Sequence, residues 1–429
     1  MRAGEAFHLT YCSNIHPGER WPDVRDVLAS ALPRVREHLA LAGPMAVGLR
    51  LSADAARELE RPAALDEFRD FLQRGQYYVP TINGFPYGAF HGQRVKDHVY
   101  LPDWRSAERL DYSNRLATIL AALLQGTGLG EGSVSTVPGG FRGHIRSESD
   151  VQDMATGILR HAALLARIRQ ETGISLGLAL EPEPACLLET THDAVAFFER
   201  HLLSDRAIAQ ANRGADIALS VDDVRRHVGV CFDACHAAVE FEDPADALAR
   251  LRQAGIRVMK VQLSSALRVP DLNAAAFAAL ERFAEDTYLH QVVERNDAGY
   301  VRFADLPDAL ASARPGPESG TEGGTEAGTA GGTEGGTASG TEASAAGGAR
   351  SREWRVHFHV PIFLAELEAF GTTQPQLEAL IACLRETPVC SVLEVETYTW
   401  DVLPPEYRHG DVCAAIAREL AWARQALAP

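Results

Sequence analysis

Asp233 and His236 are the first residues whose types and spacing suit chemistry. They lie three residues apart directly after the apolar run 228–232, which is typical of a buried parallel strand. The ends of such strands commonly carry functional groups. An oxygen ligand and an imidazole together suit a borderline divalent cation such as Mn, Zn, Fe or Co. A helix cap is the competing interpretation, with Asp233 capping the next helix and His236 in its first turn. This pair alone leaves both interpretations open.

Two other apolar runs end in carboxylates. Residues 174–180 lead into Glu181, and residues 391–396 contain Glu394 and Glu396. A carboxylate at such a position is costly unless it is paired or bound to a metal. Three carboxylate-tipped strands therefore predict one shared site. Alternation places Glu394 and Glu396 equally well, and we prefer Glu396 because it lies nearer the carboxyl end of its strand.

A pair of histidines provides a further ligand signature. In the run 354–361, strand alternation places His357 and His359 on one face. Two aligned imidazoles at positions i and i+2 could both bind a cation. The alternative is that one of them hydrogen-bonds within the core and the other is only its neighbour.

Charge and cysteine content exclude several classes of protein. The chain has 429 residues, 41 Lys and Arg against 58 Asp and Glu, and a formal net charge of -17. This charge repels phosphate backbones and anionic lipids, so nucleic acid is not an expected partner. The seven cysteines form no CxxC pair, which is typical of reduced thiols in the cytoplasm. No segment approaches the ~20 apolar residues of a membrane span, and the amino terminus lacks the apolar core of a signal peptide.

Strand and helix patterns alternate along the chain, which predicts a parallel sheet covered by helices. Eight strands are expected, at residues 7–14, 45–51, 77–84, 133–140, 174–180, 228–233, 256–265 and 391–396. A (β/α)8 TIM barrel is the economical arrangement of eight such strands. The histidine-bearing run 354–361 is then one strand too many, and it either pairs beside the barrel or replaces part of the seventh strand.

Two connecting segments depart from this pattern. The loop 85–104 is long and rich in aromatic and polar groups, which indicates a functional loop over the barrel mouth. Residues 315–350 repeat Gly-Thr every four residues and cannot bury a core. They are expected to be a disordered insertion within one barrel domain that spans residues 1–429.

Several of these motifs together resemble those of a known protein family. Glu181, Asp233-x-x-His236, the strand Lys260-Val261-Gln262 and Glu396 together resemble the xylose-isomerase-like TIM barrels, which include sugar isomerases, epimerases and endonuclease IV. Longer matches resemble the EboE family of metabolite-traffic proteins; they cover residues 11–19, 82–88, 231–240 and 394–398.

The resemblance implies a divalent metal at the barrel mouth and roles for individual residues. The implied metal ligands are Glu181, Asp233, His236, His359 and Glu396, with a contact to the substrate as the alternative role of His236. Glu181 and Glu396 would also act as acid and base on opposite faces of the substrate. Lys260, expected at a strand tip, would stabilise an oxyanion or bind phosphate, or would otherwise be a surface lysine. Substrate contacts are expected from polar residues at Asn14, His16, Asn83, His91, Gln262, His357 and Glu394.

One departure from the family pattern bears on activity. Gln262, a weak ligand, stands where the family usually has a histidine, so His357 or His359 would have to supply the missing nitrogen. Three functions follow. The first is a metal-dependent isomerase or epimerase that acts on a small metabolite, and the second is a non-catalytic carrier that works with other proteins of a metabolite-traffic pathway. The third is a metal-dependent endonuclease, which the net charge disfavours.

Overall fold

The computed structural model describes residues 1–213, 218–313, 352–408 and 410–428. The expected insertion at 315–350 lies outside these residues. None of the described helices is long and apolar enough to cross a membrane.

Eight parallel strands form the centre of the described structure. They are β2 (Phe7–Tyr11), β3 (Met45–Arg50), β4 (Tyr77–Asn83), β5 (Glu131–Thr136), β6 (Ser175–Leu180), β7 (Val228–Asp233), β8 (Arg257–Leu263) and β14 (Val392–Val395). Their order in the sheet is β2-β14-β8-β7-β6-β5-β4-β3, and a parallel bridge between Cys12 and Gly48 joins the two ends. A short strand, β1 (Arg2–Ala3), pairs antiparallel to β2. The predicted (β/α)8 barrel is confirmed.

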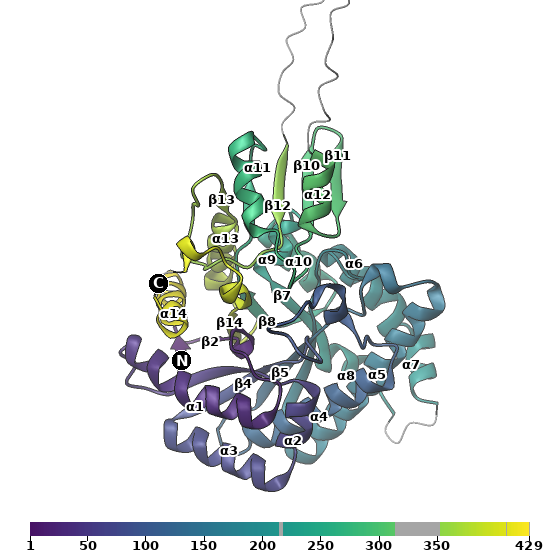
Figure 1. Ribbon diagram of the computed structural model, residues 1–429. Helices are drawn as coiled ribbons and strands as arrows, with labels where there is room; N and C mark the ends of the chain where they lie inside the picture. Colours follow the sequence, from purple (N-terminus) through teal and green to yellow (C-terminus); the bar gives the residue numbers. More distant parts are fainter. Residues whose placement is uncertain (214–217, 314–351, 409, 429) are drawn as a thin grey trace, which may run out of the picture.

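Helices surround this barrel (Figure 1). They are α1 (Trp21–His38), α2 (Ala53–Leu59), α3 (Pro62–Gly75), α4 (Ala107–Leu124), α5 (Glu148–Thr172), α6 (Thr191–Phe197), α7 (Asp205–Ala211), α8 (Val221–His227), α9 (Ala234–Val239), α10 (Pro244–Gln253), α13 (Gln374–Glu386) and α14 (Val412–Ala426). The segment 53–75 forms two helices and not one continuous helix. Pro62 has no backbone N–H to continue a helix, so α2 ends before it and α3 begins with it.

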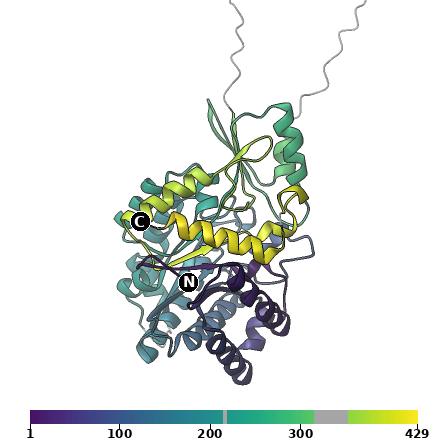
Figure 2. The same ribbon diagram turned by 90° about the vertical axis from the view of Figure 1, so that its left-hand side faces the viewer.

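A second, antiparallel sheet begins directly after the carboxyl end of β8. Its strands are β9 (Leu267–Val269), β10 (Val292–Asn296), β11 (Gly299–Phe303), β12 (Glu353–Val356) and β13 (Gly371–Thr372), in the order β11-β10-β12-β9-β13. With α11 (Ala274–Leu280) and α12 (Leu306–Ala313) it forms a layer above the barrel (Figures 1 and 2). The run 354–361 therefore pairs beside the barrel. The prediction of a continuous strand there was wrong, because β12 ends at Val356 and both histidines follow it.

This second sheet has its own apolar core. Trp354 and Val356 are buried there, and so are Phe358 and Val360 from the segment beyond the strand. The backbone N–H of Val360 donates to the carbonyl of Ser265 at 2.9 Å, directly after β8. Burial of Phe358 and Val360 on one side of this segment leaves His357 and His359 to face the barrel mouth.

Gly48 of β3 provides a test of packing inside the barrel. A Cβ atom at this position would lie 1.9 Å from Oε1 of Glu394 and 2.6 Å from the carbonyl oxygen of Tyr11. Gly48→Ala should therefore lower the free energy of unfolding by about 1–3 kcal/mol. Gly43→Ala is the matched control, because a Cβ there meets nothing within 4 Å. Urea unfolding measures both; equal stability of the two variants would contradict the prediction.

Glu419 of α14 provides a pH-dependent test. Its Oε1 accepts hydrogen bonds from the Thr397 hydroxyl at 2.7 Å and the Ile362 backbone N–H at 3.1 Å. Burial raises the pKa of Glu419 to about 7. A carboxyl whose folded pKa is raised stabilises the fold below its unfolded pKa and loses that contribution as the pH rises through the folded value.

Replacing Glu419 with glutamine should remove this pH dependence, because the amide oxygen accepts the same two hydrogen bonds. Between pH 5 and pH 8 the wild type should lose up to about 3 kcal/mol of stability that Glu419→Gln keeps. Urea unfolding of both proteins at the two pH values measures the difference. Parallel pH profiles would show that Glu419 does not titrate in this range.

Candidate metal centre

Three carboxylates meet at the carboxyl ends of barrel strands. Glu181 follows β6, Asp233 ends β7 and Glu396 follows β14. Each offers an oxygen within 4.8 Å of oxygens from the other two. All three side chains are buried, with 2–4% of each residue exposed. The fold thus brings together the three carboxylates that the sequence predicted to share a site.

Asp233 caps the next helix, one of the two roles that the sequence left open, and keeps its second oxygen available for the other. Its Oδ1 caps α9 by accepting from the backbone N–H of His236 at 2.9 Å, and it also accepts from the Ser264 hydroxyl at 2.8 Å. Its Oδ2 is buried and has no hydrogen-bond partner among the described residues. The cap and a free ligand atom therefore coexist in one side chain.

Two imidazoles complete the group around Asp233. A nitrogen of His236 and a nitrogen of His359 each lie within 4.8 Å of a carboxylate oxygen of Asp233 and of one another. Nδ1 of His359 donates to the carbonyl oxygen of Glu396 at 2.9 Å, which leaves Nε2 as the lone-pair atom. A ring held in this way by its other nitrogen is the usual arrangement of a metal-binding histidine.

Burial and mutual repulsion dominate the electrostatics. Burial raises the pKa of Glu181 well above its ordinary value, and the charges of Glu396 and Asp233 add to the shift. Burial likewise raises the pKa of Glu396, and the charge of Asp233 adds to it. Three carboxylates in one buried space repel one another, so a divalent cation among them would offset both desolvation and repulsion.

The residues fit a divalent cation. Oε2 of Glu181, Oδ2 of Asp233 and Nε2 of His359 are buried acceptors without a hydrogen-bond partner among the described residues. Such atoms are expensive unless something positive lies between them. Oxygen donors mixed with an imidazole nitrogen suit Mn, Fe, Co or Zn.

Two asparagines hold Glu396. The amide groups of Asn14 and Asn83 donate to its Oε1 at 2.8 and 2.9 Å. Asn14 is itself supported by His91, whose Nε2 lies 2.6 Å from the Asn14 carbonyl oxygen. Asn14, Asn83 and His91 thus lie at the site, and their observed contacts are with protein groups that orient Glu396.

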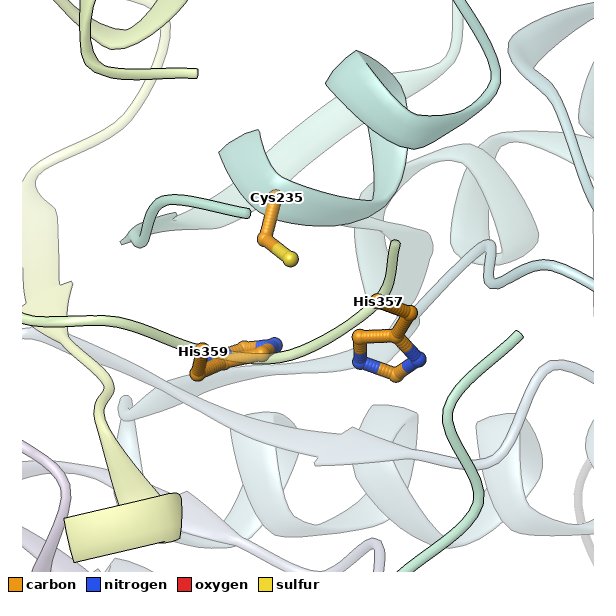
Figure 3. Close-up of side chains that lie close together, drawn as sticks. All are labelled: Cys235, His357 and His359. Carbon is orange, nitrogen blue, oxygen red and sulfur yellow. The ribbon is translucent and has the colours of Figure 1, made fainter. Parts of the chain in front are cut away.

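Figure 3 shows His357 and His359 on the segment after β12, with Cys235 of α9 facing them. Nitrogens of the two rings and the Cys235 sulfur lie within 4.8 Å of one another. His357 also groups with His236 and Glu183. Sequence reasoning did not select Cys235 or Glu183 as site residues. Glu183 had a visible signal, since it stands two residues after Glu181 at the same strand end.

Four other predicted residues lie away from these groups. His16 contacts the Tyr11 hydroxyl at 3.1 Å, beside a separate small cavity near Arg50. Gln262 of β8 is fully buried, and its Oε1 accepts from the Cys231 thiol at 3.0 Å. The other two, Lys260 and Glu394, form a buried ion pair inside the barrel. Their observed contacts are within the protein core.

The placement of Lys260 corrects the sequence interpretation. It does not lie at a strand tip, because β8 continues to Leu263, and it is 0% exposed, so it is not a surface lysine either. Glu394 is also 0% exposed. The ammonium of Lys260 lies below the three carboxylates and lowers the pKa of Glu181 and Glu396, against the larger effect of burial.

A cavity opens onto the centre. Its polar side consists of Asn14, Asn83, Glu181, Glu183, His236, His357 and Glu396. Its other walls are mainly apolar and aromatic, formed by Phe85, Pro86, Phe90, Val95, Val99, Tyr100, Tyr288, Leu289 and Tyr398. Lys96 also lines it, with its ammonium bound to Asp305 at 2.7 Å and to the Glu285 carbonyl at 2.9 Å. The loop 85–104 thus contributes walls to the cavity, as its composition suggested.

No protein-family model matches the chain, and no curated protein matches it. Solved structures of similar fold are xylose isomerase-like TIM barrels at low identity. The IOLI protein with a bound zinc atom has 12% identity over 98% of each chain and a TM-score of 0.45. A xylose isomerase-like TIM barrel protein from Mycobacterium smegmatis in complex with magnesium has 11% identity over 100% of this chain and 98% of its own, with a TM-score of 0.48. A xylose isomerase domain protein from Planctomyces limnophilus has 13% identity over 90% of each chain and a TM-score of 0.44.

Proposed function

We propose that this chain is a metal-dependent isomerase or epimerase acting on a small hydroxy-ketone or hydroxy-aldehyde. The observation that carries the proposal is the pair of ligand groups that share Asp233, one with Glu181 and Glu396 and the other with His236 and His359. Within them Glu181, Asp233 and His359 keep buried acceptors without a hydrogen-bond partner among the described residues. Such acceptors fit a divalent cation. When bound, a cation there would polarise substrate oxygens and so make the C–H bond between them more acidic.

Glu181 and Glu396 are the proposed proton carriers. Both line the cavity, and burial raises the pKa of each carboxyl, which suits groups that take up and release a proton. One takes the proton from the substrate carbon and the other returns a proton. Asn14 and Asn83 bind one oxygen of Glu396 and so fix its orientation during this exchange.

The apolar walls suit the body of the substrate. Aromatic residues such as Phe90 and Tyr100 would exclude water and pack against carbon. The same walls favour a second candidate function, in which the barrel binds a small metabolite without turnover and passes it to partners of a metabolite-traffic pathway, as the EboE resemblance implies. We place either activity in the cytoplasm. Cleavage of nucleic acid remains disfavoured by the net charge of -17.

Metal content and proton exchange test the proposal. Mass spectrometry of the purified protein should find bound divalent metal in the wild type and less of it in Asp233→Ala/Glu181→Ala. Asp26→Ala/Glu67→Ala is the matched control, because it also removes two carboxylates, which are 70% and 60% exposed. A panel of sugars and keto-acids in D2O should reveal a substrate that gains deuterium at carbon.

The outcomes separate the two candidates. Metal together with deuterium exchange supports the isomerase. Ligand binding without exchange, measured by calorimetry, supports the carrier. A well-folded wild type that takes up no divalent metal would overturn the isomerase.

A further inference from the structure

The cavity beside the metal centre has an aromatic wall opposite its polar side. The rings of Phe90, Tyr288 and Tyr398 are in mutual contact there, with centroids 5.0, 5.1 and 5.3 Å apart. Phe90 and Tyr288 are 5% and 4% exposed. The head of a substrate, defined as the carbons that bear the reacting oxygens, belongs at the metal centre. Its remaining part, the tail, therefore meets this wall and is removed from water.

The charge of the cavity disfavours an anionic tail. Lys96 is the only lysine or arginine among the described residues that line it. Its ammonium is already engaged, 2.7 Å from Oδ2 of Asp305 and 2.9 Å from the carbonyl oxygen of Glu285. The polar side carries glutamates. A phosphate or carboxylate on the tail would meet no free positive side chain there, and the glutamates would repel it.

The hydroxyl groups of the cavity are also largely engaged. The Tyr100 hydroxyl donates to Oε1 of Glu183 at 2.7 Å. The Tyr288 hydroxyl lies 3.1 Å from Nδ1 of His91, whose Nε2 lies 2.6 Å from a backbone carbonyl oxygen. In the neutral ring Nε2 therefore carries the proton, and Nδ1 accepts from Tyr288. Of the three tyrosines that line the cavity, Tyr398 alone has a hydroxyl that makes no hydrogen bond with any described residue.

These contacts disfavour a tail with several hydroxyl groups. Each hydroxyl that loses its water and finds no partner weakens binding by about 10-fold or more. An aromatic tail loses no such hydrogen bonds and gains ring contacts with Phe90, Tyr288 and Tyr398. The free hydroxyl of Tyr398 leaves room for one neutral polar group.

We propose that the substrate has an apolar or aromatic tail without phosphate or any other charged group. The inference rests on the proposed function for the hydroxy-ketone or hydroxy-aldehyde head and adds the class of tail. Phe90 is a specificity-determining residue in this account, because its ring forms part of the wall that the tail meets. Lys96 contributes by being unavailable to an anion.

Three compounds that share a hydroxymethyl ketone head test the class of tail. They are phenylethyl hydroxymethyl ketone, erythrulose and erythrulose phosphate. Calorimetry measures their binding to the full chain with manganese added, and proton NMR in D2O measures exchange at the carbon between the two oxygens. The phenylethyl compound should bind about 10- to 100-fold more tightly than erythrulose, because its ring is fully buried. Erythrulose phosphate should bind most weakly.

Phe90→Ala tests the aromatic wall. The variant should lose about 10-fold of the preference for the phenylethyl compound over erythrulose. Phe71→Ala is the matched control, because the Phe71 ring packs against Phe68 and Tyr77 outside the cavity, and it should keep the full preference. Circular dichroism establishes that both variants fold. An unchanged preference in a folded Phe90→Ala would contradict the assigned wall.

Asp305→Asn tests the exclusion of charge. It removes the negative charge beside Lys96 and keeps Oδ1, which accepts from the backbone N–H groups of His290 and Leu306, both at 3.0 Å. The released ammonium should strengthen binding of erythrulose phosphate about 10-fold and leave the phenylethyl compound unchanged. Unchanged binding of the phosphate would contradict the role given to Lys96.

The outcomes separate this inference from the proposed function. Exchange of erythrulose phosphate at least as fast as that of the phenylethyl compound would overturn the inference and leave the isomerase standing. Tighter binding of the phenylethyl compound without exchange would support the class of ligand and favour the carrier over the isomerase. Equal or absent binding of all three compounds would overturn the inference.

Discussion

Lys260→Met should lower the free energy of unfolding by about 3–5 kcal/mol, because it leaves a buried carboxylate without its partner. Lys260 and Glu394 are both 0% exposed, and Oε1 of Glu394 has no hydrogen-bond partner among the described residues. The partner ammonium is the nearest positive charge available to this carboxylate inside the barrel. Chemical denaturation at neutral pH measures the loss.

The control removes both charges. Lys260→Met/Glu394→Leu replaces the pair with apolar side chains of similar length, so it should recover most of the stability that the single variant loses. Recovery would show that the loss of stability in the single variant comes from the buried carboxylate of Glu394 that has lost its partner. If the double variant is as unstable as the single one, lost packing or the field of Lys260 on the site above it is responsible instead.

Glu396→Gln should reduce deuterium exchange into the substrate by about 10²- to 10⁴-fold, because a glutamine cannot carry the proton. The amide oxygen can still accept from Asn14 and Asn83, so the fold should be preserved. Glu396 is also a proposed ligand, and the exchange rate is therefore measured at saturating metal. An unchanged rate under that condition would exclude Glu396 as a proton carrier.

Asn83→Leu separates orientation from proton transfer. It removes one of the two hydrogen bonds to Oε1 of Glu396 and keeps the carboxylate. We expect a smaller fall in exchange than for Glu396→Gln, together with a shift in the pH profile, because the lost donor stabilised the charged form. A loss as large as that of Glu396→Gln would assign Asn83 a direct contact with the substrate.

The barrel was predictable because each of its strands corresponds to a local pattern in the sequence. Each apolar run is bounded by turn residues and followed by a helical period, and the residues that end a parallel strand must lie at one face of the barrel. This rule alone brought Glu181, Asp233 and Glu396 together. It also favoured Glu396 over Glu394, which the structure places deeper in the barrel, against Lys260.

The second sheet was not predictable by the same reasoning. Its strands have two to five residues, and apart from the β10–β11 hairpin they pair across long separations, as β9 does with β12. Short strands carry little periodicity, and antiparallel pairing at such a distance has no turn to mark it. The segment of His357 and His359 consequently resembled a strand in the sequence. In the structure, burial of Phe358 and Val360 in the second core orients the two imidazole rings.

Gln262 occupies the position where the resembled family usually has a histidine, and the resemblance alone could not say which residue replaces that histidine. The sequence identified the missing histidine and offered His357 or His359 in its place, with His359 among the implied ligands and His357 among the expected substrate contacts. The fold distinguishes them by hydrogen bonding: Nε2 of His359 is free beside Asp233, whereas Nε2 of His357 faces His236. No periodicity encodes that difference, because it depends on which carbonyl each Nδ1 meets.

The ligands come from two separately packed cores. Asp233 belongs to the barrel, while His357 and His359 are fixed by the core of the second sheet. A bound cation would therefore act as a cross-link between them, and lifting the sheet away from the barrel would require its release. By linkage, each tenfold rise in free metal above the dissociation constant should make that opening about 1.4 kcal/mol more costly. Amide hydrogen exchange in β12 would then report the occupancy of a site that the strand itself does not touch.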